Sequence, residues 1–443
     1  MVSLQREENF VVIELGSHTT KAMQDVSDVN KLPTVHIRSR AGIIKQEETS
    51  NAENTSKTKD DRMNIDEMET EDQAATEQTN GTSNAKSTDS SDQDAAGPSY
   101  VFGSAIDSAD SDALEAVVDV FTNGFVNDWD VLSAFLRHIV TKELGLRITR
   151  NTSGFLFSIP ALWPKSDLEN LTQIAFEDLN VPSIMVVEQP LMAAYGNNGL
   201  TGTVIDMGHD TVTITPIVDS VVQNHSITQS TIAGSAVTQN LQQLLQMDDE
   251  LCAQFTDKQV PLAFAEALKE SGKCRLQLLP DRADDADERQ EFEYDGKTYK
   301  IKQETLMQAP EVLMQPTQEA QMPLAALVRQ AILGCDLDKR AALWENIHIV
   351  GGSSQFGDLQ ERLQMELEST VLPASNIFAL SQTRDMQFHS VPEYFIGWRG
   401  YGHWAAFLGA CLAAKVALTD GRHFVARSDY NDSGPSIIHT KAF

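Results

Sequence analysis

The sequence is poor in basic residues, and no run of them occurs anywhere along the chain. Among its 443 residues, 34 lysines and arginines stand against 64 aspartates and glutamates, so the formal net charge is -30. Direct contact with DNA or RNA needs a basic face that neutralises phosphates. The charge balance therefore argues against specific nucleic-acid binding, and we expect any role at DNA to be indirect.

Cysteine is also scarce. The four that are present lie too far apart for Cys-x-x-Cys or Cys/His ligand spacing: Cys252, Cys274, Cys335 and Cys411. We therefore expect reduced thiols in an intracellular protein and no metal centre.

Long hydrophobic runs are missing as well. The first ten residues lack the apolar core of a secretory signal. The longest apolar stretch, residues 404–418, contains Lys415 and is shorter than the roughly 20 residues that span a bilayer. We expect a soluble protein with no membrane association. Its length and its 41% hydrophobic residues suffice for two or more subdomains.

Aliphatic and aromatic side chains are almost absent from residues 46–98, which are rich in Glu, Asp, Ser, Thr and Asn. Such a segment cannot bury enough apolar surface to offset the entropy of ordering it. We expect a disordered insert there and a solvated acidic loop at 281–290. Two interpretations of the insert stay open, a solubilising loop or an acidic tract that binds basic histone tails.

The rest of the chain alternates between strand and helix patterns, which is typical of an α/β fold. We expect strands at 9–16, 154–162 and 183–190, a hairpin over 202–222, helices at 128–144, 166–180, 191–196, 232–246 and 401–418, and strand–Gly–Gly–helix over 344–367. Asp128 is expected to cap its helix, and Ser166 or Asp167 the next one. The order strand, hairpin, helix occurs in both halves and predicts a duplicated architecture with a cleft between the halves.

Three glycine-bearing turns could meet at such a cleft: Gly16-Ser17, Gly208 and Gly351-Gly352. Glycine lets the backbone approach a phosphate closely, so that exposed N–H groups bind the anion. A lysine such as Lys21 adds a point charge, and an aspartate after a strand, such as Asp206, can hold the water shell of a metal. Any one of these turns is more often simply a turn, but three in this order point to an anion site.

Several segments resemble the actin-related protein family in order and spacing. They are "YVFGSAIDSA" (100–109), "NGFVNDWDVLSAFLRHIVTKELGL" (123–146), "PEVLMQP" (310–316), "CDLDKR" (335–340) and "SGPSIIHTKAF" (433–443). The resemblance covers nearly all of the chain outside the acidic insert. It implies an α/β, actin-like fold of the superfamily that also includes Hsp70 and the sugar kinases, with two duplicated lobes around a central cleft.

This resemblance also implies a division of the chain. The expected parts are 1–45, the start of the first lobe with the first phosphate loop; 46–98, the insert in place of the DNase-binding loop; 99–198, the rest of the first lobe; 199–400, the second lobe; and 401–443, a C-terminal helix and tail that return to the first lobe.

The first phosphate loop of actins has the form D-x-G-S-G-x-x-K. Here Gly16, Ser17 and Lys21 match it, whereas Glu14 replaces the aspartate and His18 replaces the second glycine. The longer acid would extend into the water shell of a metal, and the imidazole would crowd the phosphates.

The second loop of actins has the form D-x-G-D-G. Asp206 and Gly208 match it, but His209 and Asp210 replace its last two residues. An aspartate at about 4 Å from a phosphate costs roughly 4 kcal/mol at an effective dielectric near 20. By spacing, the water-positioning glutamine of the family corresponds to Gln189, and the histidine that assists it is replaced by Thr213.

The third loop, Gly351-Gly352, is intact and would face the sugar and α-phosphate of a nucleotide, and Lys269 and Glu270 correspond to residues near the adenine. Because hydrolysis needs water, metal and charge to be aligned closely, the altered loops predict no ATPase activity. We expect no required cofactor and at most weak binding of ATP.

"WENIHIVGGSS" (344–354) and "PEYFIGWRGYGHWAAFLGACLAAK" (392–415) are more narrowly similar to fungal actin-related subunits of SWI/SNF- and RSC-type chromatin remodellers, the actin-related protein nine group. The resemblance implies a nuclear scaffold that pairs with a second actin-related protein and binds a helical segment of a Snf2-type ATPase, alongside other remodeller subunits. Tyr195 corresponds to a cleft aromatic that packs between lobes or accepts such a helix.

Two enzymatic alternatives remain. The first is an ATP-hydrolysing, filament-forming actin relative, against which the altered loops and the acidic insert argue, since an unstructured loop cannot dock into a neighbouring subunit. The second is a sugar kinase or chaperone ATPase of the same superfamily, because fold alone does not fix function. The actin-like tail argues against the second.

Overall fold

The computed structural model describes residues 6–45, 99–108, 113–278, 288–316, 321–371, 386–420 and 423–441. The expected insert at 46–98 lies outside these residues, as does most of the acidic stretch at 281–290. Arg289 and Gln290, however, begin strand β15 (Arg289–Tyr294), so the loop predicted at 281–290 is wrong for these two residues.

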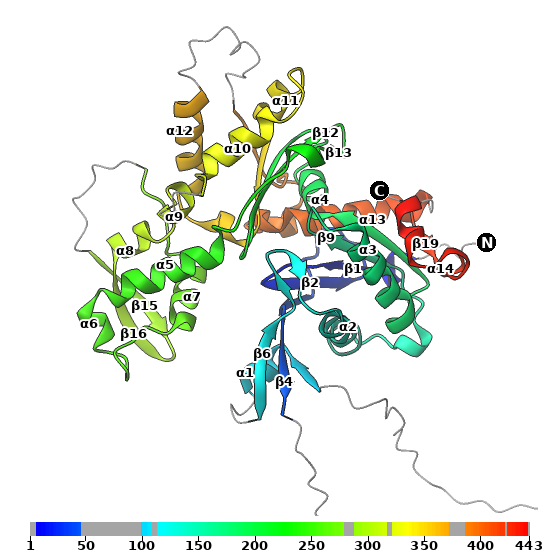
Figure 1. Cartoon of the computed structure of the whole chain (residues 1–443), viewed down its shortest axis with the longest axis horizontal. Helices are drawn as coiled ribbons and strands as arrows, with labels where there is room; N and C mark the ends of the chain where they lie inside the picture. The colour runs from blue at the N-terminus through cyan, green and yellow to red at the C-terminus, as the bar shows by residue number, and fades with distance from the viewer. Residues whose placement is uncertain are drawn as a thin grey trace, which may run out of the picture.

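The first lobe is built on a six-stranded sheet in the order β19-β10-β9-β1-β2-β3. Its strands are β1 (Val11–Glu14), β2 (Thr19–Gln24), β3 (Val35–Arg38), β9 (Phe155–Ile159), β10 (Ser183–Glu188) and β19 (Val425–Ala426). The helices of this part are α2 (Trp129–His138), α3 (Lys165–Gln173) and α14 (Arg427–Ser433). The C-terminal strand β19 pairs with β10 of the first lobe (Figure 1).

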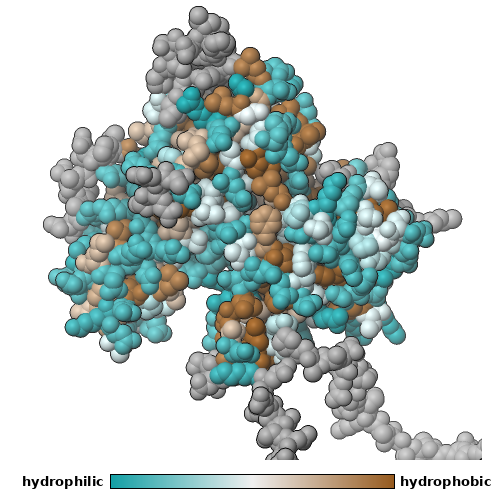
Figure 2. All heavy atoms as spheres, viewed as in Figure 1, coloured by the Kyte–Doolittle hydropathy of each residue, from teal (hydrophilic) through white to brown (hydrophobic). Residues whose placement is uncertain are grey.

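A smaller sheet of the first lobe projects from it at the bottom of Figure 1. It has the order β5-β4-β6 and is followed by a short hairpin. These elements are β4 (Arg40–Ile44), β5 (Tyr100–Phe102), α1 (Ser104–Ser108), β6 (Leu114–Asp119), β7 (Phe121–Thr122) and β8 (Phe125–Val126). Figure 2 shows hydrophobic side chains gathered over this sheet, where Val117 is 49% exposed, within a surface that is otherwise mostly hydrophilic.

The second lobe is built on a sheet in the order β13-β12-β11-β17-β18, with β14 also pairing with β12. Its strands are β11 (Gly202–Met207), β12 (Val212–Val218), β13 (Val221–Val222), β14 (Thr228–Ser230), β17 (Ile347–Val350) and β18 (Phe388–His389). The helices α10 (Leu324–Leu333), α11 (Arg340–Glu345) and α12 (Leu359–Val371) lie at the top of Figure 1.

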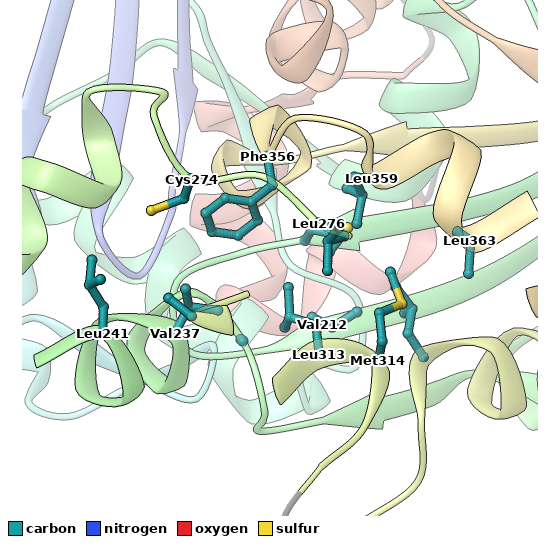
Figure 3. Close-up of a cluster of buried hydrophobic side chains, with 14 of the residues drawn as sticks. Val212, Val237, Leu241, Cys274, Leu276, Leu313, Met314, Phe356, Leu359 and Leu363 are labelled. Carbon is teal, nitrogen blue, oxygen red and sulfur yellow. The ribbon is translucent and has the colours of Figure 1, made fainter. Parts of the chain in front are cut away.

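The outer part of the second lobe combines helices with a two-stranded sheet on the left of Figure 1. It consists of α5 (Gly234–Gln246), α6 (Asp249–Cys252), α7 (Leu262–Glu270), β15, β16 (Lys297–Lys302), α8 (Gln303–Gln308) and α9 (Glu311–Met314). A continuous apolar core joins it to the inner sheet. Figure 3 shows Val212 of β12, Leu241 of α5 and Leu363 of α12 in this one cluster.

The two lobes repeat one arrangement of strands. In the first, β1 pairs antiparallel with β2 and parallel with β9. In the second, β11 pairs antiparallel with β12 and parallel with β17. The predicted duplicated α/β, actin-like fold is therefore confirmed, and each lobe directs one hairpin turn toward the space between the lobes.

Two helices connect the lobes and pack on each other with glycine at the contact. Gly196 ends α4 (Gln189–Gly196), and an added Cβ there would lie 2.0 Å from the carbonyl oxygen of Ala405. Gly409 lies inside α13 (Ala405–Asp420), and its Cβ would lie 1.8 Å from the carbonyl oxygen of Met192. The backbones touch directly, so the expected small-residue helix at 401–418 is present from residue 405 onward.

Among the described residues no helix is both long and apolar enough to cross a membrane. The four cysteines are free and buried, as expected for structural thiols.

The helix ends test two cap predictions. Asp128 caps α2, because its Oδ1 accepts hydrogen bonds from the N–H groups of Asp130 and Val131, as predicted. The prediction of Ser166 or Asp167 as a cap is wrong, because α3 begins at Lys165 and both residues lie inside its first turn. Proline at 164 precedes the helix with an extended backbone and leaves no side-chain cap.

Replacing Asp128 with alanine is expected to lower the free energy of unfolding by about 1 kcal/mol, because two N–H groups at the start of α2 lose their acceptor. Urea titration followed by circular dichroism would measure this. Asp167→Ala is the matched control, since Asp167 does not cap its helix and should change the midpoint far less. Equal effects of the two substitutions would contradict the capping role.

Candidate functional site

A cavity of about 560 Å³ lies between the lobes and is lined by both hairpin turns. All of the residues predicted for the site line this one cavity: Gly16, Ser17, Lys21, Gln189, Asp206, Gly208, Lys269, Glu270, Gly351 and Gly352. The two altered positions Glu14 and His18 line it as well, as do His209 and Thr213. The fold thus brings together residues as far apart in sequence as Gly16 and Gly351.

Lys21 and Glu14 form a buried ion pair at the base of the cavity. They face each other across the β1–β2 register, and Lys21 Nζ lies 2.5 Å from Glu14 Oε1. The ammonium also lies 5.6 Å from the ring centre of Trp404, an arrangement that adds a cation–π attraction. The positive charge of Lys21, which could bind a phosphate, is therefore balanced by the carboxylate of Glu14.

Asp206 is the next-to-last residue of β11 and interacts with both members of this ion pair. Burial, followed by the neighbouring Glu14 carboxylate, raises the pKa of Asp206 to about 6, with Lys21 acting in the opposite direction. Gly351 has φ 90° and approaches so closely that an added Cβ would lie 2.6 Å from Asp206 Oδ1, so only glycine fits. The base of the cavity thus holds two carboxylates and one lysine.

The tips of the two hairpin turns touch through stacked imidazoles. The rings of His18 and His209 have centroids 4.2 Å apart at an interplanar angle of 21°. Burial lowers the pKa of His209 to about 3, with His18, Lys269 and Arg38 adding repulsion of the charged form, so His209 is neutral at pH 7. Because the rings are in van der Waals contact, no phosphate fits between them.

Asp210 is turned toward the first lobe and is not among the residues that line the cavity. Its Oδ2 accepts a hydrogen bond from the backbone N–H of Asn123, at 3.2 Å. Asn123 lies in the β7–β8 turn with φ 53°. The carboxylate expected at the phosphate cradle therefore contacts the opposite lobe, and the repulsion expected against a bound phosphate is weaker than its position in the loop suggests.

Gln189 is the first residue of α4 and not part of a strand, which differs from the expected position. Its amide Nε2 donates to the carbonyl oxygens of Leu15 (2.6 Å) and Ser158 (3.3 Å). Thr213, on β12, lines the cavity without a ring nitrogen to assist. The amide N–H groups thus serve to hold the first-lobe strands.

Lys269 and Glu270 end α7 and face different partners. Lys269 Nζ donates to the carbonyl oxygen of Gly234 and to Thr238 Oγ1, and burial lowers its pKa. Glu270 Oε1 lies 3.2 Å from His18 Nε2. The ammonium of Lys269 and the carboxylate of Glu270 thus both form hydrogen bonds within the protein.

Sequence reasoning missed several residues of the site: His36, Arg38, Glu266, His403 and Trp404. His403 lines the cavity, and burial lowers its pKa to about 4. Glu266 had one detectable signal, because it precedes Glu270 by four residues and shares its helix face. His403 and Trp404 lie in the segment 392–415, which carried no site prediction, and His36 and Arg38 belong to no quoted motif.

The fold and the site define a class, the two-lobed proteins whose paired hairpins enclose a nucleotide-type cleft. The particular family follows from comparison, because a sequence model of the actin family matches residues 5–443. The chain therefore belongs to the actin family.

Similar proteins cover about three quarters of the chain. Actin-related protein 7 of Oryza sativa subsp. indica is 26% identical over 350 residues, which span 75% of this chain and 88% of that protein. Actin-like protein 9 of Homo sapiens is 28% identical over 340 residues, 74% of each chain. Actin-related protein 7 of Arabidopsis thaliana is 26% identical over 337 residues, 74% of this chain and 86% of that protein.

Proposed function

We propose that this protein is a non-catalytic actin-related subunit that acts as a scaffold in a nuclear chromatin-remodelling complex. The observation that carries the proposal is the pairing of Lys21 with Glu14 beneath the stacked rings of His18 and His209. Groups that could hold phosphates and a metal contact one another instead. Such a cleft is better suited to holding the two lobes together than to catalysing ATP hydrolysis.

Hydrolysis is disfavoured on electrostatic grounds as well. A transition state that gains negative charge needs preorganised positive groups close to the phosphate. Lys21 is neutralised, His209 is uncharged at pH 7, and the amide of Gln189 donates to backbone carbonyls. None of these three groups is available to stabilise the transferred phosphoryl group or to orient water.

The expected partners are a second actin-related protein and a helical segment of a Snf2-type ATPase, with other remodeller subunits around them. The assignment rests on the resemblance of residues 344–354 and 392–415 to the fungal actin-related protein nine group, and membership of the actin family is compatible with it. Apolar side chains also lie exposed near the end of α4, where Leu200 is 62% and Val221 is 61% exposed. An amphipathic helix is the kind of partner that covers such side chains.

Nucleotide content and turnover test the non-catalytic part of the proposal. Purified protein is denatured and its supernatant analysed for ATP and ADP, and the native protein is assayed for Mg-ATP hydrolysis. We expect substoichiometric nucleotide and no turnover above that of a sample lacking the protein. Stoichiometric release together with turnover would establish the alternative, an ATP-hydrolysing actin relative.

A set of reversions provides the matched arm of this experiment. Glu14→Asp, His18→Gly, His209→Asp and Asp210→Gly together restore the loop residues of conventional actins. Mg-ATP affinity, measured by calorimetry, is expected to rise at least tenfold over the original chain. An unchanged affinity in a folded variant would show that these four residues do not weaken the site.

Capture by the ATPase segment tests the scaffold part. The full chain is mixed with a second actin-related protein and a tagged helical segment of a Snf2-type ATPase, and co-purification is measured. A chain carrying Leu200→Glu and Val221→Glu is the matched variant and is expected to lose capture. If the original chain remains unbound, the proposed partners are wrong.

A further inference from the structure

A second set of contacts joins the lobes at the mouth of the cavity. His18 and Arg38 come from the first lobe, whereas Glu266 and Glu270 lie on α7 of the second. Arg38 Nη1 lies 2.6 Å from Glu266 Oε1, and Arg38 Nη2 lies 3.4 Å from Glu270 Oε1. His18 Nε2 lies 3.4 Å from Glu266 Oε1 and 3.2 Å from Glu270 Oε1. We call these four side chains the latch.

Glu266 and Glu270 are placed on α7 so that both can interact with positive groups of the first lobe. Residues four apart on a helix lie on one face, and two carboxylates in that relation repel each other. Arg38 and His18 approach both carboxylates from the opposite lobe. The hydrogen bond from His18, followed by the charge of Arg38, lowers the pKa of Glu270. Arg38 and His18 thus relieve part of the repulsion while the lobes are together, in addition to Lys269 on the same helix.

A further contact lies at another point of the same boundary. The backbone N–H of Asn123 in the first lobe donates to Asp210 Oδ2 in the second, and the rings of His18 and His209 stack across the gap. The lobes are therefore bridged by several groups of the chain itself, and none of these contacts needs a ligand between them.

We propose that the latch keeps the lobes closed in the absence of nucleotide and that opening it is the conformational change available to this protein. Each ion pair is partly exposed, with side-chain exposure of 34% for Arg38 and 24% for Glu266. Single pairs of this kind contribute little, but several that share one arginine act together. The latch is therefore strong enough to bias closure and weak enough to open when a partner binds one lobe.

A divalent cation could replace Arg38 in the same place. Ligand atoms of His18, Glu266 and Glu270 lie within 4.8 Å of one another, which is short enough for a shared ion. The guanidinium of Arg38 already donates to Glu266 and Glu270, and its positive charge repels a metal. We therefore assign closure to the ion pairs.

The distance between the outer parts of the two lobes tests the proposal. Spin labels are placed at Val117→Cys on β6 and Leu262→Cys on α7, which are 49% and 50% exposed, while the four native cysteines are buried. Pulsed dipolar spectroscopy on the full chain should give one narrow distance distribution. Adding Mg-ATP or EDTA should leave it unchanged.

Charge reversal of the latch gives the decisive comparison. Glu266→Lys with Glu270→Lys is expected to raise the ratio of open to closed molecules about tenfold, since attraction becomes repulsion. Arg38→Glu added to these two changes should restore the closed distribution. Asp107→Asn is the matched control, because it removes an arginine–carboxylate pair within the first lobe, Arg40–Asp107, that does not cross the cleft.

Three results would overturn the proposal. The first is a distance distribution in the charge-reversed variant that equals that of the original chain. The second is opening by EDTA, which would assign closure to a metal. The third is closure that appears only after Mg-ATP is added. None of these results measures hydrolysis, which the turnover assay tests by itself, so the latch and the non-catalytic function can fail independently.

Discussion

Replacing Gly409 with alanine is expected to lower the free energy of unfolding by about 3 kcal/mol or more, although alanine is the better helix former by about 1 kcal/mol. The reason is the contact between α13 and α4. A Cβ at this position would lie 1.8 Å from the carbonyl oxygen of Met192 and 2.7 Å from its carbonyl carbon. Those atoms belong to the backbone of α4 and cannot rotate away, so the two helices must separate.

Separation of these helices affects both lobes, because α4 leads from the first lobe to the second and α13 leads back. Gly196 makes the reciprocal contact with the carbonyl oxygen of Ala405, and any shift at Gly409 also loosens it. Overpacking that the backbone must absorb belongs to the most damaging class of substitution. We therefore expect reduced yield of folded protein as well as a lower urea midpoint.

Urea unfolding followed by tryptophan fluorescence measures the effect. Gly402→Ala is the matched control, because nothing lies within 4 Å of a Cβ at Gly402, and its midpoint should stay close to that of the original chain. A Gly409→Ala protein as stable as the Gly402→Ala protein would mean that the two helices do not pack this closely.

Local pattern predicted most of the elements, because each depends on residues near it in sequence. The hairpin turning at Gly208 and the cap at Asp128 are of this kind. The start of α3 was wrong because two good cap residues follow Pro164, and the proline sets the helix entry before either can act. The strand at Arg289 was hidden by the acidic residues before it.

The cavity itself followed from the glycine turns, since two of them close the duplicated hairpins and the third follows β17, which lies beside one of those hairpins. The contacts that the turns make across the cavity could not be predicted from the glycines. Arg38 reaches Glu266 across 228 residues of sequence, and Asn123 reaches Asp210 through a backbone N–H that every residue but proline carries. Such contacts depend on how the lobes come together, and no motif marks them.

Replacing Asp206 with asparagine is expected to stabilise the protein at pH 7 by about 3 kcal/mol. Burial and the Glu14 carboxylate raise the pKa of Asp206 from 3.8 to about 6. Well below pH 3.8 the acid is protonated in both the folded and the unfolded chain and costs nothing. As the pH rises through about 6 the folded chain must ionise it, so the original protein loses this stability and does not regain it at higher pH.

Asparagine resembles the protonated acid, so the difference between the two proteins should depend on pH in a defined direction. Urea midpoints measured from pH 3 to pH 8 should be nearly equal at the acidic end and should diverge between pH 4 and 6, with the Asp206→Asn protein the more stable above pH 6. Asp432→Asn, at an exposed position on α14, controls for the loss of one negative charge from an acidic chain and should show no such divergence. A gain that is constant across the range would mean that the pKa of Asp206 is not raised in the folded chain, and a loss of stability at pH 7 would mean that Lys21 stabilises the Asp206 carboxylate more than burial and Glu14 oppose it.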